Sequence, residues 1–155
     1  MTILISGLVA GPALGAGRAP DSRVTAVCTS PAPVISGIAR AWDAGRTSHV
    51  RGWTASYDAT GDPLCAGTVE VVAGIEMSAG IAGLRGTVVY RLSGIDGGWT
   101  GRFEQTWAFD QGLLTYGREV ATGFGELAGW QLRATLSEAF DGTITEIDEV
   151  FVPGG

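Results

Sequence analysis

The sequence predicts an all-β domain, a closed antiparallel up-and-down β-barrel of about eight strands, from three observations. Apolar and polar residues alternate with a period of two over successive segments, which is typical of strands with one buried face. Glycine and aspartate separate these segments, and the chain holds 25 glycines in 155 residues, which suits many tight turns. The i, i+3, i+4, i+7 spacing of an amphipathic helix is absent from the sequence. The domain is expected over residues 23–155, after an N-terminal segment at 1–22.

Nine segments carry the strand pattern, and short turns connect most of them. The expected strands are residues 24–29, 34–42, 48–57, 64–72, 84–92, 99–109, 113–122, 130–140 and 143–152. The Asp-Gly pairs at 96–97 and 141–142 tolerate the positive φ of tight hairpin turns, and residues 60–63 and 110–112 predict two further turns. A meander of hairpins removes its exposed edges best by closing on itself, which favours the barrel. A two-sheet β-sandwich is the alternative fold.

The charge of the chain limits its partners. The formal net charge is −6, and all ten basic residues are arginines scattered along the sequence. Nucleic-acid binding needs a basic stripe, so that class is excluded, and an anionic membrane surface would repel the chain. The apolar run at residues 2–16 contains Gly and Pro and is too short to span a bilayer. It resembles the hydrophobic region of a secretory signal, which predicts a secreted or periplasmic protein. A flexible arm on a cytoplasmic protein is the alternative, and the oligomeric state, a homo-oligomer included, stays open.

The cysteines and the single histidine restrict the chemistry. Cys28 and Cys65 lie outside any CxxC motif, and His49 is the only histidine, so a structural zinc site lacks ligands and no metal is expected. A disulfide between Cys28 and Cys65 is predicted if the protein is exported, and two separate buried thiols are the alternative. No G-x-S-x-G motif occurs, and a lone histidine argues against a catalytic triad.

The alternation along each strand assigns side chains to an inner and an outer face. Aromatic faces are assigned to the inside, because burying each ring stabilises the fold by roughly 1.5–3 kcal/mol. The inner set contains the ligand-binding candidates Trp53, Phe103, Gln105, Trp107 and Trp130, and the catalytic candidates Tyr57, Tyr90, Tyr116 and Arg118. Arg51 shares a face with Trp53 and joins this inner set. Glu146 and Asp148, near the end of the last strand, are interpreted as part of a solvated edge.

Residues 79–137 resemble the allene-oxide-cyclase-like barrel families, which include dirigent proteins, spirotetronate-type cyclases and bacterial barrels of unknown function. The similar stretches are GIAGLRG at 80–86, WTGRFE at 99–104 and GFGELAG at 123–129. These are glycine corners, so the resemblance concerns the fold, and no family catalytic residue is carried over. It implies a barrel with a mostly apolar lumen, whose relatives bind or reshape apolar small molecules without a cofactor.

The leading functional hypothesis is a barrel that binds an apolar small molecule in its lumen. An enzyme of this kind would catalyse cyclisation or isomerisation without a cofactor, by holding one conformer of the substrate and polarising a carbonyl with a Tyr or Arg donor. The alternative is a secreted, non-catalytic carrier or interaction module whose barrel is filled by its own side chains.

Overall fold

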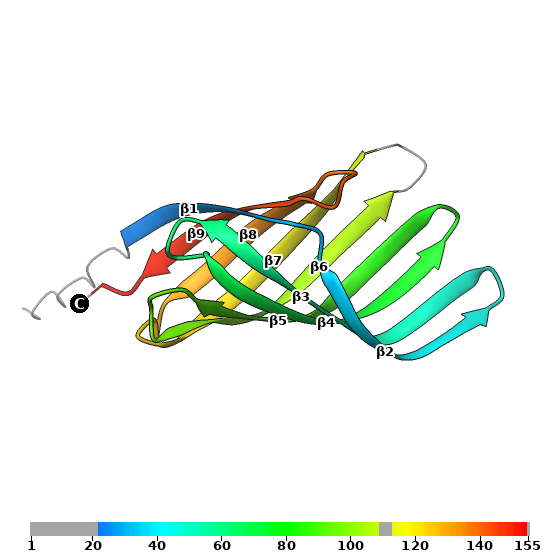
Figure 1. Cartoon of the computed structure of the whole chain (residues 1–155), viewed down its shortest axis with the longest axis horizontal. Helices are drawn as coiled ribbons and strands as arrows, with labels where there is room; N and C mark the ends of the chain where they lie inside the picture. Colours follow the sequence, from blue (N-terminus) through cyan, green and yellow to red (C-terminus); the bar gives the residue numbers. More distant parts are fainter. Residues whose placement is uncertain (1–21, 109–112, 155) are drawn as a thin grey trace, which may run out of the picture.

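The computed structural model describes residues 22–108 and 113–154. Within these ranges the chain forms one sheet of nine antiparallel strands and no helix (Figure 1). The signal-like segment, the last residue of the strand expected at 99–109, and the turn expected at 110–112 lie outside the described residues. Because one sheet contains every described strand, the alternative of a two-sheet sandwich is wrong.

Each of the nine expected segments contains a strand. The strands are β1 Ser22–Ser30, β2 Val34–Ala44, β3 Thr47–Gly61, β4 Gly67–Ser78, β5 Ile81–Leu92, β6 Gly97–Ala108, β7 Leu113–Gly125, β8 Gln131–Glu138 and β9 Ile144–Val152. The end of β4 differs most from the prediction, at Ser78 instead of residue 72. Its start moves to Gly67 because residues 62–66 form a turn, in which the backbone N–H groups of Cys65 and Ala66 both donate to the carbonyl oxygen of Asp62.

The pairings link eight of the strands in a ring. Neighbouring strands pair in the order β1-β9-β8-β7-β6-β5-β4-β3-β2, and β1 also pairs with β3. This additional pairing is short, with Cys28 opposite Gly61 and Thr29 opposite Thr60. It joins β1 to β3 and so completes the ring, and β2 lies outside the ring.

Two prolines explain why β1 and β2 diverge. Both strands run along the same edge of β3, but Pro31 and Pro33 separate them. Proline has no N–H to donate to a ladder, so the chain leaves β3 here. Upstream of the prolines β1 pairs with β9 along its whole length, and downstream β2 pairs only with β3.

A β-bulge in β3 places Arg51 on the opposite face from the predicted one. The register shifts between Val50 and Trp53, where Gly52 has a φ of 63°. The extra residue changes the parity of the strand, so Val50 and Trp53 are both buried while Arg51 lies outside and donates to Glu76. The inward placement of Arg51 was therefore wrong. His49 also lies on the outer face, where its ring stacks on Trp42 at 5.1 Å.

The face of β7 that was predicted to point inward points outward. Its inner positions are Gly117, Glu119 and Ala121, while Tyr116 is 66% exposed and Arg118 is exposed. The small residues face inward because large side chains of neighbouring strands fill the interior: a Cβ on Gly117 would lie 3.2 Å from Leu136 Cδ1. Packing across strands thus outweighs the hydrophobicity of one strand.

Candidate active site

Three carboxyls and two tyrosines gather in the interior of the ring. They are Glu119 of β7, Glu146 and Asp148 of β9, Tyr57 of β3 and Tyr90 of β5, and each is at most 8% exposed. A protein rarely buries carboxyl groups without a partner of opposite charge, and among the described residues none of the three forms a salt bridge. This acidic cluster is therefore costly to fold, which marks it as a candidate site.

The inner face of β9 supplies two of the carboxyls. Ile144, Glu146, Asp148 and Val150 alternate with more exposed residues, so all four point inward. The interpretation of Glu146 and Asp148 as a solvated edge was wrong. The signal that could have placed them was their spacing of four and two residues from the apolar Val150, because residues i, i+2 and i+4 of a strand share a face.

Small residues on the neighbouring strands leave room for the cluster. In the register across the sheet, Ala134 of β8 lies between Glu119 and Asp148. Asp148 is in turn paired with Ala26 of β1. Both alanines are buried, so the two carboxyl side chains occupy interior space that larger residues would fill.

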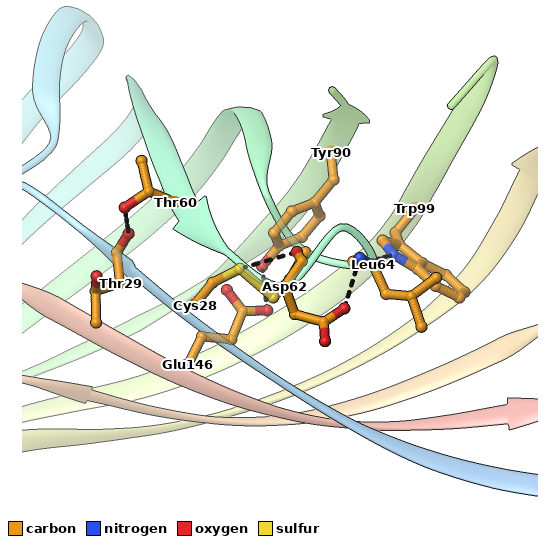
Figure 2. The surroundings of a disulfide bond; sticks show 9 residues. Cys28, Thr29, Thr60, Asp62, Leu64, Tyr90, Trp99 and Glu146 are labelled. Atoms are coloured by element: carbon orange, nitrogen blue, oxygen red, sulfur yellow. Dashed lines mark hydrogen bonds between the residues drawn. A yellow bond between two sulfur atoms is a disulfide. The ribbon is translucent and has the colours of Figure 1, made fainter. Parts of the chain in front are cut away.

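The Tyr90 hydroxyl connects two of the carboxyls. Its oxygen lies 2.9 Å from Glu119 Oε2 and 2.9 Å from Glu146 Oε1. Figure 2 shows Tyr90 and Glu146 pointing toward one another beside the Cys28 sulfur. Tyr90 is fully buried, so these contacts are shielded from bulk water and are stronger than they would be at the surface.

Burial changes the protonation of the whole cluster. It raises the pKa of Glu119 well above its ordinary value, and the nearby charge of Glu146 raises it further. Burial also raises the pKa of Glu146, and it raises the pKa of Asp148 to about 10, with the charge of Glu146 as the second cause. The pKa values of Tyr57 and Tyr90 rise for the same reason. The cluster therefore holds protons at neutral pH.

An apolar pocket reaches this cluster. Its walls include Trp53, Phe103, Trp107 and Leu84, and Tyr57 and Glu119 also line it. The pocket has a volume of about 30 Å³. One water needs roughly 10–15 Å³ and a drug-sized ligand roughly 300–1,000 Å³. The pocket as described thus has room for about two waters, and a larger ligand must displace side chains.

Polar side chains close one part of the pocket wall. Gln105 Nε2 donates to Glu138 Oε2 at 3.0 Å, and Trp107 Nε1 donates to the same oxygen at 3.1 Å. All three residues are only half-buried. They are less buried than Trp53, Leu84 and Phe103 of the same lining.

The polar atoms of the cluster are incompletely satisfied. In the described part of the chain, Glu119 Oε1 and both carboxyl oxygens of Asp148 are buried without a hydrogen-bond partner. Leaving such an atom unpaired costs about 1–3 kcal/mol. Of these atoms, Glu119 Oε1 belongs to a residue that lines the pocket, so a bound molecule can satisfy it.

The structure brings together only some of the residues that the sequence singled out. Trp53, Tyr57, Phe103, Gln105 and Trp107 line the pocket, and Tyr90 lies in the acidic cluster behind it. Tyr116 and Arg118 point outward, and the half-buried Trp130 is not part of the pocket lining. The inward placement of Tyr116 and Arg118 was wrong, and sequence reasoning missed Glu119 altogether.

A disulfide joins Cys28 and Cys65, with their Cα atoms 6.0 Å apart. Cys28 belongs to β1 and Cys65 to the turn between β3 and β4. Both residues are buried. The bond lies where β1 meets β3, and Tyr90 and Glu146 of the acidic cluster are among the residues around it (Figure 2).

Comparisons with known proteins do not identify a family for this chain. No family model matches it, and neither does any curated protein. Within residues 22–108 and 113–154, no group of His, Cys, Asp and Glu side chains is arranged to hold a metal ion. In the same ranges, no helix has the length and apolar character to cross a membrane.

Proposed function

We propose that the ring of eight strands is a closed barrel that binds an apolar, carbonyl-bearing small molecule, and that Glu119 isomerises it by proton transfer without a cofactor. The observation that carries this proposal is the Glu119 carboxyl, which is 3% exposed, lines the apolar pocket and has one oxygen without a partner. The acidity of catalytic groups is commonly adjusted in this way, by burial next to other titratable groups.

The raised pKa of Glu119 suits it to act on carbon acids. In its ionised form Glu119 accepts a proton through Oε1 from the carbon next to the substrate carbonyl. The electron pair of that C–H bond forms a carbon–carbon double bond to the carbonyl carbon, and the π pair of the carbonyl moves to its oxygen. The same proton then returns to a different carbon, which shifts the double bond and regenerates the carboxylate. A carboxylate with a raised pKa is a stronger base than an ordinary carboxylate, and its ionised fraction grows as the pH rises toward that pKa.

Tyr57 is the donor that stabilises the negative charge on the carbonyl oxygen. It lines the same pocket as Glu119, and burial raises its pKa, so its hydroxyl keeps its proton. A donor already aimed at the developing charge can account for several kcal/mol of a barrier. The rings of Trp53 and Phe103 hold one conformer of the substrate against these two groups.

The pocket volume means that binding requires movement. The Gln105, Trp107 and Glu138 side chains are the half-buried part of the lining, and we propose that they move apart to admit the ligand. The resemblance to allene-oxide-cyclase-like barrels favours the same class of ligand. The buried disulfide favours an oxidising compartment, and therefore secretion or a periplasmic location.

Binding is tested with a neutral apolar fluorophore, N-phenyl-naphthylamine, and two pairs of variants. Val71 lines the pocket, whereas the adjacent Val72 is 49% exposed on the outer face. Val71→Ala should strengthen binding, because it enlarges the pocket, and Val71→Phe should weaken it by about tenfold. The controls Val72→Ala and Val72→Phe should leave the affinity unchanged. Parent protein that does not bind the fluorophore, or Val72 variants that match those at Val71, would overturn the proposal.

Catalysis is tested with a β,γ-unsaturated cyclohexenone, whose conjugation on isomerisation is followed by ultraviolet absorbance. Glu119→Gln removes the proton-transfer group while keeping its size, and the rate should fall by about a hundredfold or more. Glu104→Gln is the matched control, because the Glu104 side chain is 71% exposed on the neighbouring strand. Equal rates in these two variants would show that Glu119 takes no part in the reaction.

A second candidate is a non-catalytic interaction module with a filled barrel. The observation that favours it is the volume of only about 30 Å³. In that case no variant at Val71 binds the fluorophore more tightly than the parent, and Val71→Phe acts only by lowering the melting temperature through overpacking.

A further inference from the structure

We infer that Tyr90 is a positioning residue that shares one proton between Glu119 and Glu146, and so sets whether Glu119 meets the substrate as an acid or as a base. This use of the proton depends on the proposed function. The sharing itself follows from the hydrogen bonds of the cluster and holds without a substrate.

The two hydrogen bonds of the Tyr90 oxygen need more hydrogens than the phenol itself supplies. The Tyr90 oxygen makes two contacts of 2.9 Å, one with Glu119 Oε2 and one with Glu146 Oε1. Each contact needs one hydrogen between the two oxygens, and a phenol supplies only one. The second hydrogen must come from a carboxyl group. At least one of the two carboxyls is therefore protonated whenever both contacts are made.

Two arrangements of the same atoms satisfy this count. In the first, Glu119 Oε2–H donates to the Tyr90 oxygen and the Tyr90 O–H donates to the ionised Glu146. In the second, Glu146 Oε1–H donates to the Tyr90 oxygen and the Tyr90 O–H donates to the ionised Glu119. One proton moves across each hydrogen bond to interconvert them, and the total charge stays the same.

The two arrangements differ in what they present to the pocket. Glu119 lines the pocket, while Glu146 is not part of its lining. When the shared proton is on Glu146, Glu119 is a carboxylate whose free Oε1 can accept a proton from a substrate. When the shared proton is on Glu119, that residue is an acid. Through Tyr90 the shared proton can therefore reside on Glu146, which leaves Glu119 ionised and able to act as a base.

The surrounding charges favour a pair that keeps one proton. Tyr57 from β3 and Asp148 from β9 interact with the pair, and Asp62 from the turn after β3 acts on Asp148. All of these are neutral or negative. Two ionised carboxylates on one buried tyrosine would repel each other, and neither forms a salt bridge with a cation in the described part of the chain. The pair therefore titrates as one coupled unit rather than as two separate groups.

The direct test is carboxyl-carbon NMR on the full chain with isotope-labelled glutamate. Glu119→Gln and Glu146→Gln assign the two signals. At neutral pH we expect the two carbons together to report one retained proton, and each signal should titrate in two steps. If both carbons have the chemical shift of a full carboxylate at neutral pH, no proton is shared and the inference is wrong.

Tyr90→Phe and Tyr57→Phe separate sharing from simple core packing. Both tyrosines are buried and both sit beside the carboxyls, but only Tyr90 hydrogen-bonds to both glutamates. Tyr90→Phe should raise the apparent pKa of Glu119 by about one unit or more, and Tyr57→Phe should change it by well under one unit. Equal shifts in the two variants would reduce Tyr90 to a packing role.

Glu146→Gln keeps the test decisive if Tyr90→Phe does not fold. The Gln amide N–H₂ can donate to the Tyr90 oxygen but cannot hand over a proton. Tyr90 must then donate permanently to Glu119, so the pKa of Glu119 should fall by about one unit or more. An unchanged Glu119 pKa would contradict the inference. These signals need no ligand, so a failure of fluorophore binding would overturn the proposed function while leaving the shared proton in place.

Discussion

Cys28 lies opposite Gly61 in the short pairing of β1 with β3, and its sulfur is bonded to Cys65 just beyond that pairing. Only two residue pairs connect β1 to β3 in the described structure, and the disulfide adds a covalent connection beside them. Trp99 stabilises the same turn, because its buried indole N–H donates to the carbonyl oxygen of Leu64 at 2.8 Å. The completion of the ring of strands depends on these few contacts.

Removal of the disulfide should therefore destabilise the protein strongly. The bond closes a loop with a sequence separation of 37, which corresponds to about 4 kcal/mol in the chain-entropy model. We expect Cys28→Ala/Cys65→Ala to lower the melting temperature by about 10 °C. The melting temperature is measured by circular dichroism. The control is the parent protein measured without reducing agent, so that its disulfide stays intact. A fall of less than about 2 °C would mean that the pairing holds without the bond.

Gly61→Ala should weaken the same junction from the other side. Gly61 has a φ of 143°, and a Cβ there would lie 2.4 Å from the carbonyl oxygen of Val27. Strain and clash together should cost roughly 2 kcal/mol or more, measured by urea denaturation. Gly45→Ala is the control, because Gly45 also has a positive φ but has nothing within 4 Å of its Cβ position. Equal losses in the two variants would show that backbone strain alone matters.

Asp148 should make the protein less stable as the pH rises. Its folded pKa of about 10 lies above the ordinary value of 3.8, so the folded state holds a proton that the unfolded state has released. Stability is then fully present below the unfolded pKa and is lost progressively as the pH rises toward the folded pKa. Asp148→Asn removes this proton, so it should raise the melting temperature at about pH 8 by roughly 3 °C or more and change it much less at about pH 4.

The control for Asp148→Asn is Asp96→Asn, at an exposed position in the turn before β6. This variant should shift the melting temperature by the same small amount at both pH values. If Asp148→Asn also shows no difference between the two pH values, Asp148 is ionised in the folded protein and the protonation of the cluster must be revised.

Arg118→Leu should leave fluorophore binding unchanged to within about twofold. The sequence placed Arg118 on the inner face, but its side chain is exposed on the outer face, where it cannot contact a ligand in the pocket. Fluorescence titration of the variant beside Glu119→Gln provides the comparison. Loss of binding in Arg118→Leu would show that the ligand lies on the outer wall of the ring.

The strands and the inner aromatic residues could be predicted from the sequence because their signals are local. Trp99 and Phe103 alternate with Arg102 and Glu104, and the alternation alone places the aromatic residues inside. The face of β7 could not be predicted in this way. Tyr116 lies outward because Gly117 must pack under Leu136 of the next strand, and that contact is visible only once the register is known.

The acidic cluster was missed for a different physical reason. Glu119 and Glu146 are 27 positions apart in the sequence, and each alone is more often a surface residue than a buried one. Tyr90, which joins them, comes from a third strand. The β3 bulge at Gly52 could not be predicted either. A single glycine in a strand does not show whether the alternation of inner and outer residues shifts at that position.

The pairing of β1 with β9 also has a mechanical consequence. Ser22 lies opposite Val152, so the two ends of the described sheet are side by side (Figure 1). A force that separates these ends would break the β1–β9 hydrogen bonds one after another, like a zipper, rather than shear them all at once. This sequential rupture would stop at Cys28, where the disulfide transmits the force to the turn at Cys65. Under tension, the oxidised protein should therefore yield early over six residues and then resist, whereas the reduced protein should continue to peel open.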